Sequence, residues 1–358
     1  MASISWHGDK EMYKAAVLHS PQHLIMEQRA KPQIGDKEAL IRVGMAGVCG
    51  TDIAIYSGNY TVPLPLVLGH EFVGVVVEIG SQVSPELVGK LATAEINNTC
   101  VSYGSDSPCA ACIRGLPNHC LRRTVLGITE YDGAFAELVK VPANNIHPLT
   151  PGISLEEAVF IEPLAAAIQT FELTEVKPGD TVVILGAGRL GILVVAVAAI
   201  MGARVAAVSR SEDKLERCLK YGASLAINAA SEDVVSRVMA FTKGLGADVV
   251  VEATGSADAI QVTLDLVRPR GTIAVKTTSG LPAHNIDTTR LVVNEVRFQG
   301  SRCGPFKKAI ELLEARKIDV KPLIAAVYSL DELDEAIAGA RNLPKVLIDT
   351  SGRQRSIS

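Results

Sequence analysis

Four of the seven cysteines lie close together in the sequence, and their spacing suits a metal site. They are Cys100, Cys109, Cys112 and Cys120, and only two residues separate the middle pair. Four thiolates are a usual ligand set for a closed, tetrahedral structural zinc site. An odd total of cysteines, four of them crowded together, does not suit a secreted disulfide framework. The cluster therefore predicts a structural zinc ion in a loop rich in Ser, Gly and Pro, with unrelated buried thiols as the alternative.

A second group of possible metal ligands is spread over the first half of the chain. Cys49 follows an expected strand, His70 and Glu71 precede another, and Glu162 stands at the start of a helical region. A catalytic zinc ion needs three protein ligands and one open position, and thiolate, imidazole and carboxylate are all suitable ligands. Any one of these residues alone would more often belong to the core or the surface. Their occurrence together with a nucleotide fold predicts a catalytic zinc site.

A glycine-rich turn between an expected strand, 180–185, and an expected helix, 190–201, has the pattern of a dinucleotide site. The first glycine permits a tight turn, the second lets a pyrophosphate approach the backbone, and the third allows close packing of helix and strand. The helix N-terminus offers free N–H groups to the phosphates. A glycine turn without a ligand is the alternative. We expect five residues of this turn to bind the dinucleotide: Gly186, Gly188, Arg189, Leu190 and Gly191.

The end of the next expected strand, 204–208, points to the type of dinucleotide. An NAD enzyme would end this strand with an Asp or Glu that holds the ribose 2′-OH, but no acid stands here before Glu212. Ser209 can donate a hydrogen bond to a 2′-phosphate, and Arg210 can pair with that phosphate or stack on the adenine. Lys214, one turn later, can assist. The sequence therefore favours NADP(H) over NAD(H), with a merely solvated Arg210 as the alternative.

The order of the remaining elements predicts what positions these side chains. Strands and helices alternate from about residue 165 to 298, which predicts a parallel, doubly wound sheet. The first 150 residues instead contain short apolar runs bounded by Gly, Pro or Ser, which predict a β-rich region. Ser154 and Glu157 form a capping box that predicts a helix over 158–171. Further strands are expected at 13–19, 38–45, 71–83, 224–228, 248–253, 271–275 and 346–349, and further helices at 213–221, 305–316 and 330–341.

The composition excludes several classes of protein. The 358 residues carry a formal net charge of −4 and have 48% hydrophobic residues, which suits a globular protein of two domains. Mild acidity argues against a nucleic-acid partner. The longest apolar run is too short to span a membrane, and residues 1–13 have no apolar core of the signal-peptide type. We therefore expect a cytoplasmic protein with neither nucleic-acid nor membrane partners.

Taken together, these motifs resemble those of the zinc-containing medium-chain dehydrogenase/reductases, the alcohol and polyol dehydrogenase superfamily. The resemblance runs from about residue 12 to 350. It implies an α/β fold, in which a β-rich GroES-like catalytic domain, 1–164 with 299–358, accompanies a Rossmann domain, 165–298. The motifs that carry the resemblance are Gly47-Val-Cys49-Gly-Thr51-Asp52, Gly69-His70-Glu71, the cysteine cluster, Glu162-Pro163-Leu164-Ala165, the glycine turn and Val251-Glu-Ala-Thr254-Gly255.

The resemblance also implies a role for each residue near the catalytic metal. Cys49, His70 and Glu162 would be zinc ligands, and Glu71 would be the nearby carboxylate that can ligate or exchange during turnover. Asp52 would orient His70. Zinc would act as a Lewis acid on the oxygen of an alcohol or carbonyl group while hydride moves between the substrate carbon and the nicotinamide. Thr51 would be the hydroxyl that passes the substrate proton toward solvent.

Other implied positions concern the cofactor and the assembly. Thr254, Gly255 and Arg302 would lie along the cofactor, and Lys345 is a further candidate. Members of the family commonly form dimers or tetramers through the Rossmann sheet, so we expect a homodimer or homotetramer. Cys218 and Cys303 are expected to be packed bystanders.

The chain departs from the family pattern at two places. Many members carry a histidine at the outer end of the proton relay, where this chain has Ala54, so that water, Tyr56 or a cofactor ribose hydroxyl would take its place. The first gap of the cysteine cluster has eight residues, whereas two are common. Asp106 stands where regular spacing would put the first ligand, but we favour Cys100 because thiolate suits structural zinc better than carboxylate.

We therefore expect an enzyme that transfers a hydride between NADP(H) and a small alcohol or carbonyl compound. An NAD-dependent polyol or threonine-type dehydrogenase is the alternative within the family. A zinc-free quinone or enoyl reductase would lack the cysteine cluster, and a non-catalytic relative would have lost its metal ligands first. Neither loss is seen in this sequence.

Overall fold

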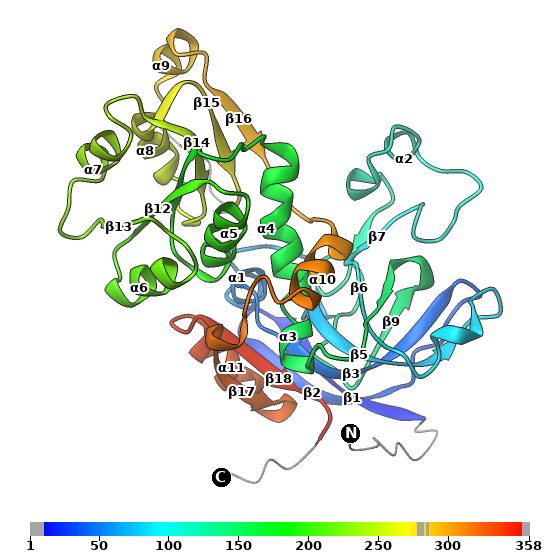
Figure 1. Ribbon diagram of the computed structural model, residues 1–358. Coiled ribbons are helices and arrows are strands. Elements are labelled where there is room, and N and C mark those ends of the chain that lie inside the picture. The colour runs from blue at the N-terminus through cyan, green and yellow to red at the C-terminus, as the bar shows by residue number, and fades with distance from the viewer. Residues whose placement is uncertain (1–10, 278–282, 284–285, 353–358) are drawn as a thin grey trace. The chain divides into compact units, whose positions relative to one another are not determined.

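The computed structural model describes residues 11–277, 283 and 286–352 (Figure 1). Residues 1–10, which include most of the segment inspected for a signal-peptide core, lie outside this description. The chain divides into two compact units, Met1–Phe160 with Val320–Ser358 and Ile161–Asp319. Within the described residues, no helix is both long enough and apolar enough to cross a membrane.

The first unit is built on a seven-stranded sheet. Its strand order is β10-β6-β5-β3-β18-β17, with β9 also paired to β3, and a three-stranded sheet ordered β2-β1-β4 belongs to the same unit. The strands are β1 Met12–Ser20, β2 His23–Ala30, β3 Glu38–Gly47, β4 Leu66–Val67, β5 Glu71–Ile79, β6 Leu91–Ala94, β7 Asn97–Asn98, β8 Thr124–Val125, β9 Leu138–Pro142, β10 Ile146–Pro148, β17 Ile324–Ser329 and β18 Lys345–Asp349. The helices are α1 Gly50–Tyr56, α2 Ala110–Ile113, α3 Leu155–Ala158 and α11 Leu333–Ala340.

Three strands of this sheet bring distant parts of the sequence together. β3 is mostly buried and pairs antiparallel with β5, so that Gly47 lies opposite Glu71. On its other side β3 pairs antiparallel with β18, which places Leu347 opposite Gly47. The C-terminal segment of the chain therefore completes the sheet of the N-terminal segment, beside the ends of β3 and β5.

The second unit is a doubly wound α/β domain, which confirms the expected fold class. All six strands are parallel, in the order β13-β12-β11-β14-β15-β16. The strands are β11 Thr181–Leu185, β12 Arg204–Ser209, β13 Leu225–Asn228, β14 Ala247–Glu252, β15 Val267–Val275 and β16 Arg297–Gly300. The helices are α4 Ile161–Leu173, α5 Arg189–Ile200, α6 Glu212–Lys220, α7 Val234–Phe241, α8 Ala259–Leu266, α9 Thr288–Val293 and α10 Phe306–Glu314.

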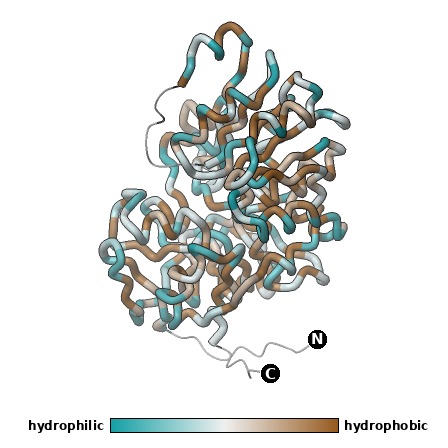
Figure 2. The backbone as a smooth tube through the Cα atoms, turned by 90° about the vertical axis from the view of Figure 1, so that its left-hand side faces the viewer, coloured by the Kyte–Doolittle hydropathy of each residue, from teal (hydrophilic) through white to brown (hydrophobic). Residues whose placement is uncertain are grey.

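The burial of this unit follows from its sequence pattern. Every residue of β11 is buried, as expected for a central parallel strand that is covered on both faces. By contrast, α6 buries only Leu215 and Cys218 and exposes its charged side. Figure 2 shows the result along the chain, where apolar stretches alternate with polar ones.

The structure differs from the sequence-based expectations both at the boundaries of elements and in several strands that were not expected, among them β2, β9 and β16. The helix expected over 158–171 is two helices, α3 and α4, although the predicted capping box is present, with the Ser154 side chain accepting from the Glu157 N–H. β5 ends at Ile79 rather than at 83, because Gly80 turns back and its N–H donates to the carbonyl of Glu38 at 2.8 Å. β17 was not expected at all.

Candidate metal centre and dinucleotide site

Cys49, His70 and Glu71 form a compact group of metal-ligating side chains in the first unit. Their ligand atoms all lie within 4.8 Å of one another. Cys49 is the N-cap of α1 directly after β3, and Glu71 is the first residue of β5, so the pairing of the two strands brings the three together. His70 and Glu71 are buried and Cys49 is partly exposed. The group therefore has one accessible side and one enclosed side.

Asp52 holds this group in place. Its carboxylate is fully buried and accepts hydrogen bonds from the N–H of Cys49 at 2.8 Å and from the N–H of Gly69 at 3.2 Å. The Oδ1 atom lies 3.4 Å from Nδ1 of His70. Burial lowers the pKa of His70, but the charges of Asp52 and Cys49 outweigh it and raise that pKa well above its usual value. One anionic side chain therefore fixes the backbone before both Cys49 and His70 and also attracts the imidazole.

A buried ion pair ties Glu71 to the C-terminal strand. The ammonium of Lys345, at the start of β18, donates to Oε2 of Glu71, and both side chains are buried. Gly47 permits this approach, because a Cβ there would lie 2.7 Å from Glu71 Oε2 and 2.9 Å from Lys345 Cε. Lys345 was expected near the cofactor; spacing did not reveal its pairing with Glu71, since the two residues are 274 positions apart.

The other two residues expected at the catalytic metal occupy different places. The hydroxyl of Thr51 lies 3.8 Å from Sγ of Cys49, on the first turn of α1. Glu162 belongs to the second unit, where it is buried in the first turn of α4. Its part in the metal site therefore stays a prediction.

The four clustered cysteines also converge. The ligand atoms of Cys100, Cys109, Cys112 and Cys120 lie within 4.8 Å of one another, and Asp106 is not part of this group. The Sγ atoms of Cys100 and Cys120 are 3.5 Å apart, and those of Cys109 and Cys120 are 3.7 Å apart. The eight residues between Cys100 and Cys109 therefore form a loop whose two ends lie together, so that Cys100 is close to the other three cysteines.

Donors of the surrounding loop stabilise negative charge on these sulfur atoms. The N–H of Leu121 donates to Sγ of Cys109 at 3.3 Å, and the guanidinium of Arg122 donates to Sγ of Cys100 at 3.1 Å. Backbone hydrogen bonds from Cys112 and Leu121 lower the pKa of Cys109 to about 6. Burial and the neighbouring cysteines instead raise the pKa of Cys112 to about 12. Zinc binds thiolates rather than thiols, so these donors favour the metal-binding form of Cys100 and Cys109.

In the second unit the glycine turn has the geometry expected of a phosphate-binding turn. Gly186 has a φ of +107°, and a Cβ there would lie 2.7 Å from the carbonyl carbon of Ala253. A Cβ on Gly191 would lie 1.9 Å from the carbonyl oxygen of Gly186. Gly188 is the N-cap of α5 and faces open space, with no atom within 4 Å of such a Cβ. The turn is therefore tight on one side and open on the side where a phosphate would approach.

The end of β12 presents a hydroxyl and a guanidinium. Ser209 is the last residue of the strand, and Arg210 is exposed beside it. The nearest following acid, Glu212, accepts a hydrogen bond from the side chain of Asn228 at 2.6 Å. Its carboxylate is therefore engaged at the end of β13. Lys214 lies partly buried in the first turns of α6.

A polar network covers the ends of β14 and β15. The buried carboxylate of Glu252 accepts from the N–H and the hydroxyl of Thr254, both at 2.6 Å, and from the hydroxyl of Thr277 at 2.7 Å. That hydroxyl of Thr277 in turn accepts from the N–H of Gly255 at 2.8 Å. The network fixes the two expected cofactor residues, Thr254 and Gly255. Our sequence analysis missed Glu252 and Thr277, although Glu252 falls within a motif that it quoted.

Arg302, the last expected cofactor residue, follows β16. Its carbonyl accepts from the ammonium of Lys276 at 2.7 Å, and Lys276 directly follows β15. Burial lowers the pKa of Lys276 to about 8, although the charges of Glu162 and Cys303 oppose that shift. Sequence reasoning also missed Lys276; a lysine directly after a buried strand is the signal that could have revealed it.

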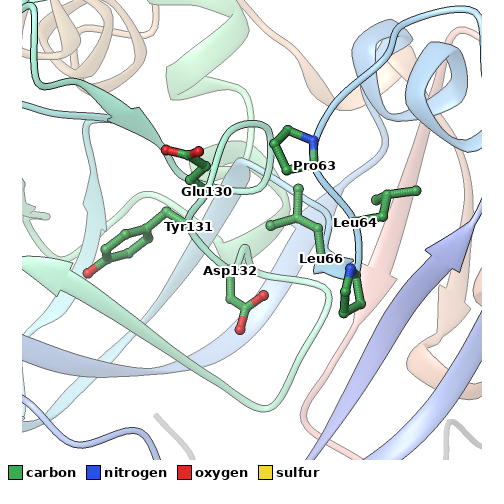
Figure 3. Close-up of a pocket in the computed structure, with 7 residues that line it drawn as sticks. Pro63, Leu64, Leu66, Glu130, Tyr131 and Asp132 are labelled. Atoms are coloured by element: carbon green, nitrogen blue, oxygen red, sulfur yellow. The ribbon is translucent and has the colours of Figure 1, made fainter.

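The first unit also carries a pocket of about 280 Å³ (Figure 3). Its polar groups are occupied by the fold itself: Asp132 accepts from Arg29 at 2.8 Å and from the N–H of Val67 at 3.0 Å, and Tyr131 donates to Glu38 at 3.3 Å. No predicted site residue lines it, and we assign it no ligand. The lining residues are Pro63, Leu64, Pro65, Leu66, Glu130, Tyr131 and Asp132.

Comparison with known families covers both parts of the chain. The family model described as an alcohol dehydrogenase GroES-like domain matches residues 35–151, and that described as a zinc-binding dehydrogenase matches residues 190–317. A sorbitol dehydrogenase of Bacillus subtilis is 32% identical over 93% of this chain and 95% of its own length. An L-threonine 3-dehydrogenase of Bacillus licheniformis is 34% identical over 85% of this chain and 88% of its own length.

Solved structures agree with these matches. A zinc-binding dehydrogenase from Sinorhizobium meliloti bound to NADP is 31% identical, with a TM-score of 0.86 over 95% of this chain and all of the other. An alcohol dehydrogenase from Thermus sp. ATN1 is 29% identical, with a TM-score of 0.83 over 94% and 99% of the two chains. The chain therefore belongs to the zinc-containing medium-chain dehydrogenase/reductases, as an NAD(P)-dependent zinc alcohol dehydrogenase that acts on CH–OH groups.

Proposed function

We propose that the protein transfers a hydride between NADP(H) and a small alcohol or carbonyl substrate at a zinc ion. The group of Cys49, His70 and Glu71, held by Asp52, carries the proposal. A thiolate and an imidazole suit zinc, and Nδ1 of His70 is buried without a well-formed hydrogen bond in the described part of the chain. We assign catalysis to 1–164 with 299–358 and dinucleotide binding to 165–298.

In this proposal Cys49, His70 and Glu162 would hold the zinc ion, and Glu71 would be the nearby carboxylate. A bound zinc ion supplies Lewis acidity toward the substrate oxygen, and a bound nicotinamide supplies or accepts the hydride. The ion pair with Lys345 neutralises Glu71 and restrains its exchange with the other ligands. Asp52 fixes the orientation of His70.

Proton transfer begins at Thr51, whose hydroxyl lies beside Cys49. Ala54, one turn further along α1, offers no group that could continue the relay. Of the remaining candidates, Tyr56 has its hydroxyl engaged with Asp334. Water or a ribose hydroxyl of the cofactor therefore best completes the relay.

The preference for NADP(H) depends on the end of β12. Ser209 and the exposed Arg210 offer a donor and a positive charge to a 2′-phosphate, while Glu212 is held by Asn228. The solved relative from Sinorhizobium meliloti is bound to NADP, which supports this assignment. An NAD-dependent polyol or threonine dehydrogenase remains the second candidate, because sorbitol and threonine dehydrogenases are among the relatives.

We expect Arg210→Ala to raise the KM for NADP(H) by about 10- to 100-fold, because a charge-assisted hydrogen bond contributes about 1.5–3 kcal/mol. The KM for NAD(H), which has no 2′-phosphate, should change by less than about twofold. Steady-state kinetics with both cofactors measure the two values. Lys220→Ala, which removes an exposed positive charge at the other end of α6, is the matched control. Equal losses with both cofactors would contradict the assignment.

A direct test of the whole function combines three measurements on the intact protein. Metal analysis should find two zinc ions per chain, fluorescence titration should show tighter binding of NADPH than of NADH, and absorbance at the nicotinamide band should reveal turnover of small alcohols. A panel of sugar alcohols, aliphatic alcohols and hydroxy amino acids with NADP would identify the substrate class. A protein that binds neither metal nor dinucleotide would end the proposal.

We also propose that two copies of the chain associate through the edge of the parallel sheet. β16 ends the strand order and, among the strands of the described residues, pairs with β15 alone, so its outer edge is available to a partner strand. The adjacent helix α9 exposes Val292 and Val293, each 73% accessible, and β16 itself exposes Phe298. Apolar side chains beside an open edge strand are typical of an interface.

Replacing Val292 and Val293 together with Asp should convert the oligomer into monomers, because two charges would be placed in an apolar contact. Sedimentation velocity at micromolar concentration measures the state of assembly. Leu245→Asp is the matched control, since Leu245 is 60% exposed in the same unit but lies between α7 and β14. An unchanged oligomer in the double variant would exclude this edge as the interface.

A further inference from the structure

Glu38 is a buried carboxylate that accepts hydrogen bonds from two separate loops. It begins β3 and is 8% exposed. Its Oε1 atom accepts from the hydroxyl of Tyr103 and from the hydroxyl of Tyr131, each at 3.3 Å. Its Oε2 atom accepts from the N–H of Gly35 at 2.8 Å and lies 3.4 Å from the ammonium of Lys140. One buried oxygen therefore joins the two tyrosines, while the other holds the carboxylate in place.

Tyr103 connects Glu38 to the cysteine cluster. The N–H of Tyr103 donates to the carbonyl of Thr99 at 3.2 Å, and the N–H of Ser105 donates to the carbonyl of Cys100 at 2.9 Å. These two hydrogen bonds enclose Cys100 and Tyr103 in the same turn of the backbone. The position of the Tyr103 hydroxyl therefore depends on where the sulfur of Cys100 is held.

Tyr131 leads from the same carboxylate to the backbone before His70. Its carbonyl accepts from the N–H of Gly127 at 2.8 Å. Gly127 packs directly on Gly69, since it has a φ of +67° and a Cβ there would lie 2.4 Å from the carbonyl oxygen of Gly69. On the other side of Tyr131, the N–H of Ala134 donates to that same oxygen at 2.8 Å. Gly69 directly precedes His70, so the segment that carries Tyr131 supports the backbone of this imidazole.

These contacts run without a break from the cysteine cluster to a set of residues that we call the Cys49 group: Cys49, His70 and Glu71. We propose that Glu38 is a positioning residue that couples the two sites, so that a metal ion at the four cysteines strengthens metal binding at the Cys49 group. Without that ion the turn that carries Tyr103 gains freedom, and the carboxylate loses one of the two bonds that orient it toward Tyr131. Coupling between binding sites is reciprocal, so each metal ion strengthens binding of the other by the same factor. This inference rests on the proposed zinc function and deepens it.

The experiment measures the dissociation constant of Co²⁺ at each site of the intact protein, freed of other metals, in competition with a chelator of known affinity. A site with four thiolates absorbs more strongly in the sulfur-to-cobalt charge-transfer band than a site with one, so the two can be followed separately. We expect Cys100→Ser to raise the Kd at the Cys49 group about fivefold, the lower end of coupling between sites. Tyr103→Phe, which keeps all four cysteines, should raise it by a similar factor. In the double variant the two effects should not add, because both remove the same link.

Two further variants separate this link from general loosening of the cysteine loop. Lys37→Met removes a different anchor of the same loop, the hydrogen bond from its ammonium to the carbonyl of Gly104 at 3.0 Å, and should leave the Kd at the Cys49 group within about twofold of the wild type. Cys49→Ser tests the coupling in the opposite direction and should weaken Co²⁺ binding at the four cysteines about fivefold, which keeps the inference testable if Cys100→Ser does not fold. Equal effects of Lys37→Met and Tyr103→Phe would overturn the inference. Independent binding of two ions would also overturn it and leave the proposed function standing, whereas a protein that binds no metal at the Cys49 group would overturn both.

Discussion

Replacement of Cys49 by Ser is expected to lower kcat by ~10³-fold or more, because it removes the thiolate from the proposed catalytic metal site. A metal ion contributes several kcal/mol to stabilising charge in the transition state, and each 1.36 kcal/mol corresponds to a factor of ten in rate. Serine is a poor replacement, since its neutral hydroxyl is a weak ligand for zinc. Metal analysis of the same variant should show about one zinc ion fewer per chain.

The variant should still bind the dinucleotide nearly as well as the wild type. The glycine turn and the end of β12 belong to the second unit, whereas Cys49 belongs to the first. Cys218→Ala is the matched control: it removes a buried thiol on α6 that belongs to neither metal-ligating group. The control should keep its zinc and its turnover. A Cys49→Ser protein with normal kcat would remove Cys49 from the catalytic site.

Features that depend on neighbouring residues were predictable from the sequence. The glycine turn needs only a strand, six residues and a helix, and Gly186, Gly188 and Gly191 have the conformations and close approaches that the pattern requires. The capping box at Ser154 is equally local. The parallel sheet could be predicted because alternating strands and helices allow few other arrangements.

Features that depend on strand pairing between distant segments were not predictable. Lys345 reaches Glu71 only because β18 pairs with β3, which also pairs with β5. Lys276 reaches Ser301 and Arg302 because β15 and β16 are neighbours in the sheet. Sequence patterns indicate that such strands exist, but the partner of a strand depends on packing of the whole unit. Local patterns also say little about where a helix breaks, as at the junction of α3 and α4.

The cysteine loop combines both kinds of feature, and its first ligand could not be decided from spacing alone. Asp106 has the regular spacing, whereas Cys100 has the better chemistry. The structure brings Cys100 within 3.5 Å of Cys120, sulfur to sulfur, and the intervening loop is held by Tyr103, whose hydroxyl donates to Glu38 at 3.3 Å. The extra residues of the gap thus lead from Cys100 through an anchored loop to Cys109.

We expect Cys100→Ser to release the metal of this loop and to lower the Tm by about 10 °C. Structural zinc sites stabilise the folded state strongly, with apparent binding free energies of about 10–16 kcal/mol in small peptides. A loss of about 3–5 kcal/mol from one missing ligand would shift the Tm by about 2–4 °C per kcal/mol in a domain of about 150–250 residues. Thermal unfolding with and without a chelator measures this shift, and the chelator should affect the wild type more than the variant.

The matched control is Asp106→Asn, which removes the charge of the other candidate ligand and leaves all four thiolates. Because Asp106 is not part of the metal-ligating group, this variant should keep both zinc ions and the wild-type Tm. Loss of zinc from Asp106→Asn together with its retention in Cys100→Ser would reverse the assignment. Loss in both variants would instead show that the loop conformation, rather than the fourth ligand alone, determines metal binding. The two variants therefore distinguish the candidate ligands. Cys100 and Asp106 lie in the same loop, but only Cys100 belongs to the metal-ligating group.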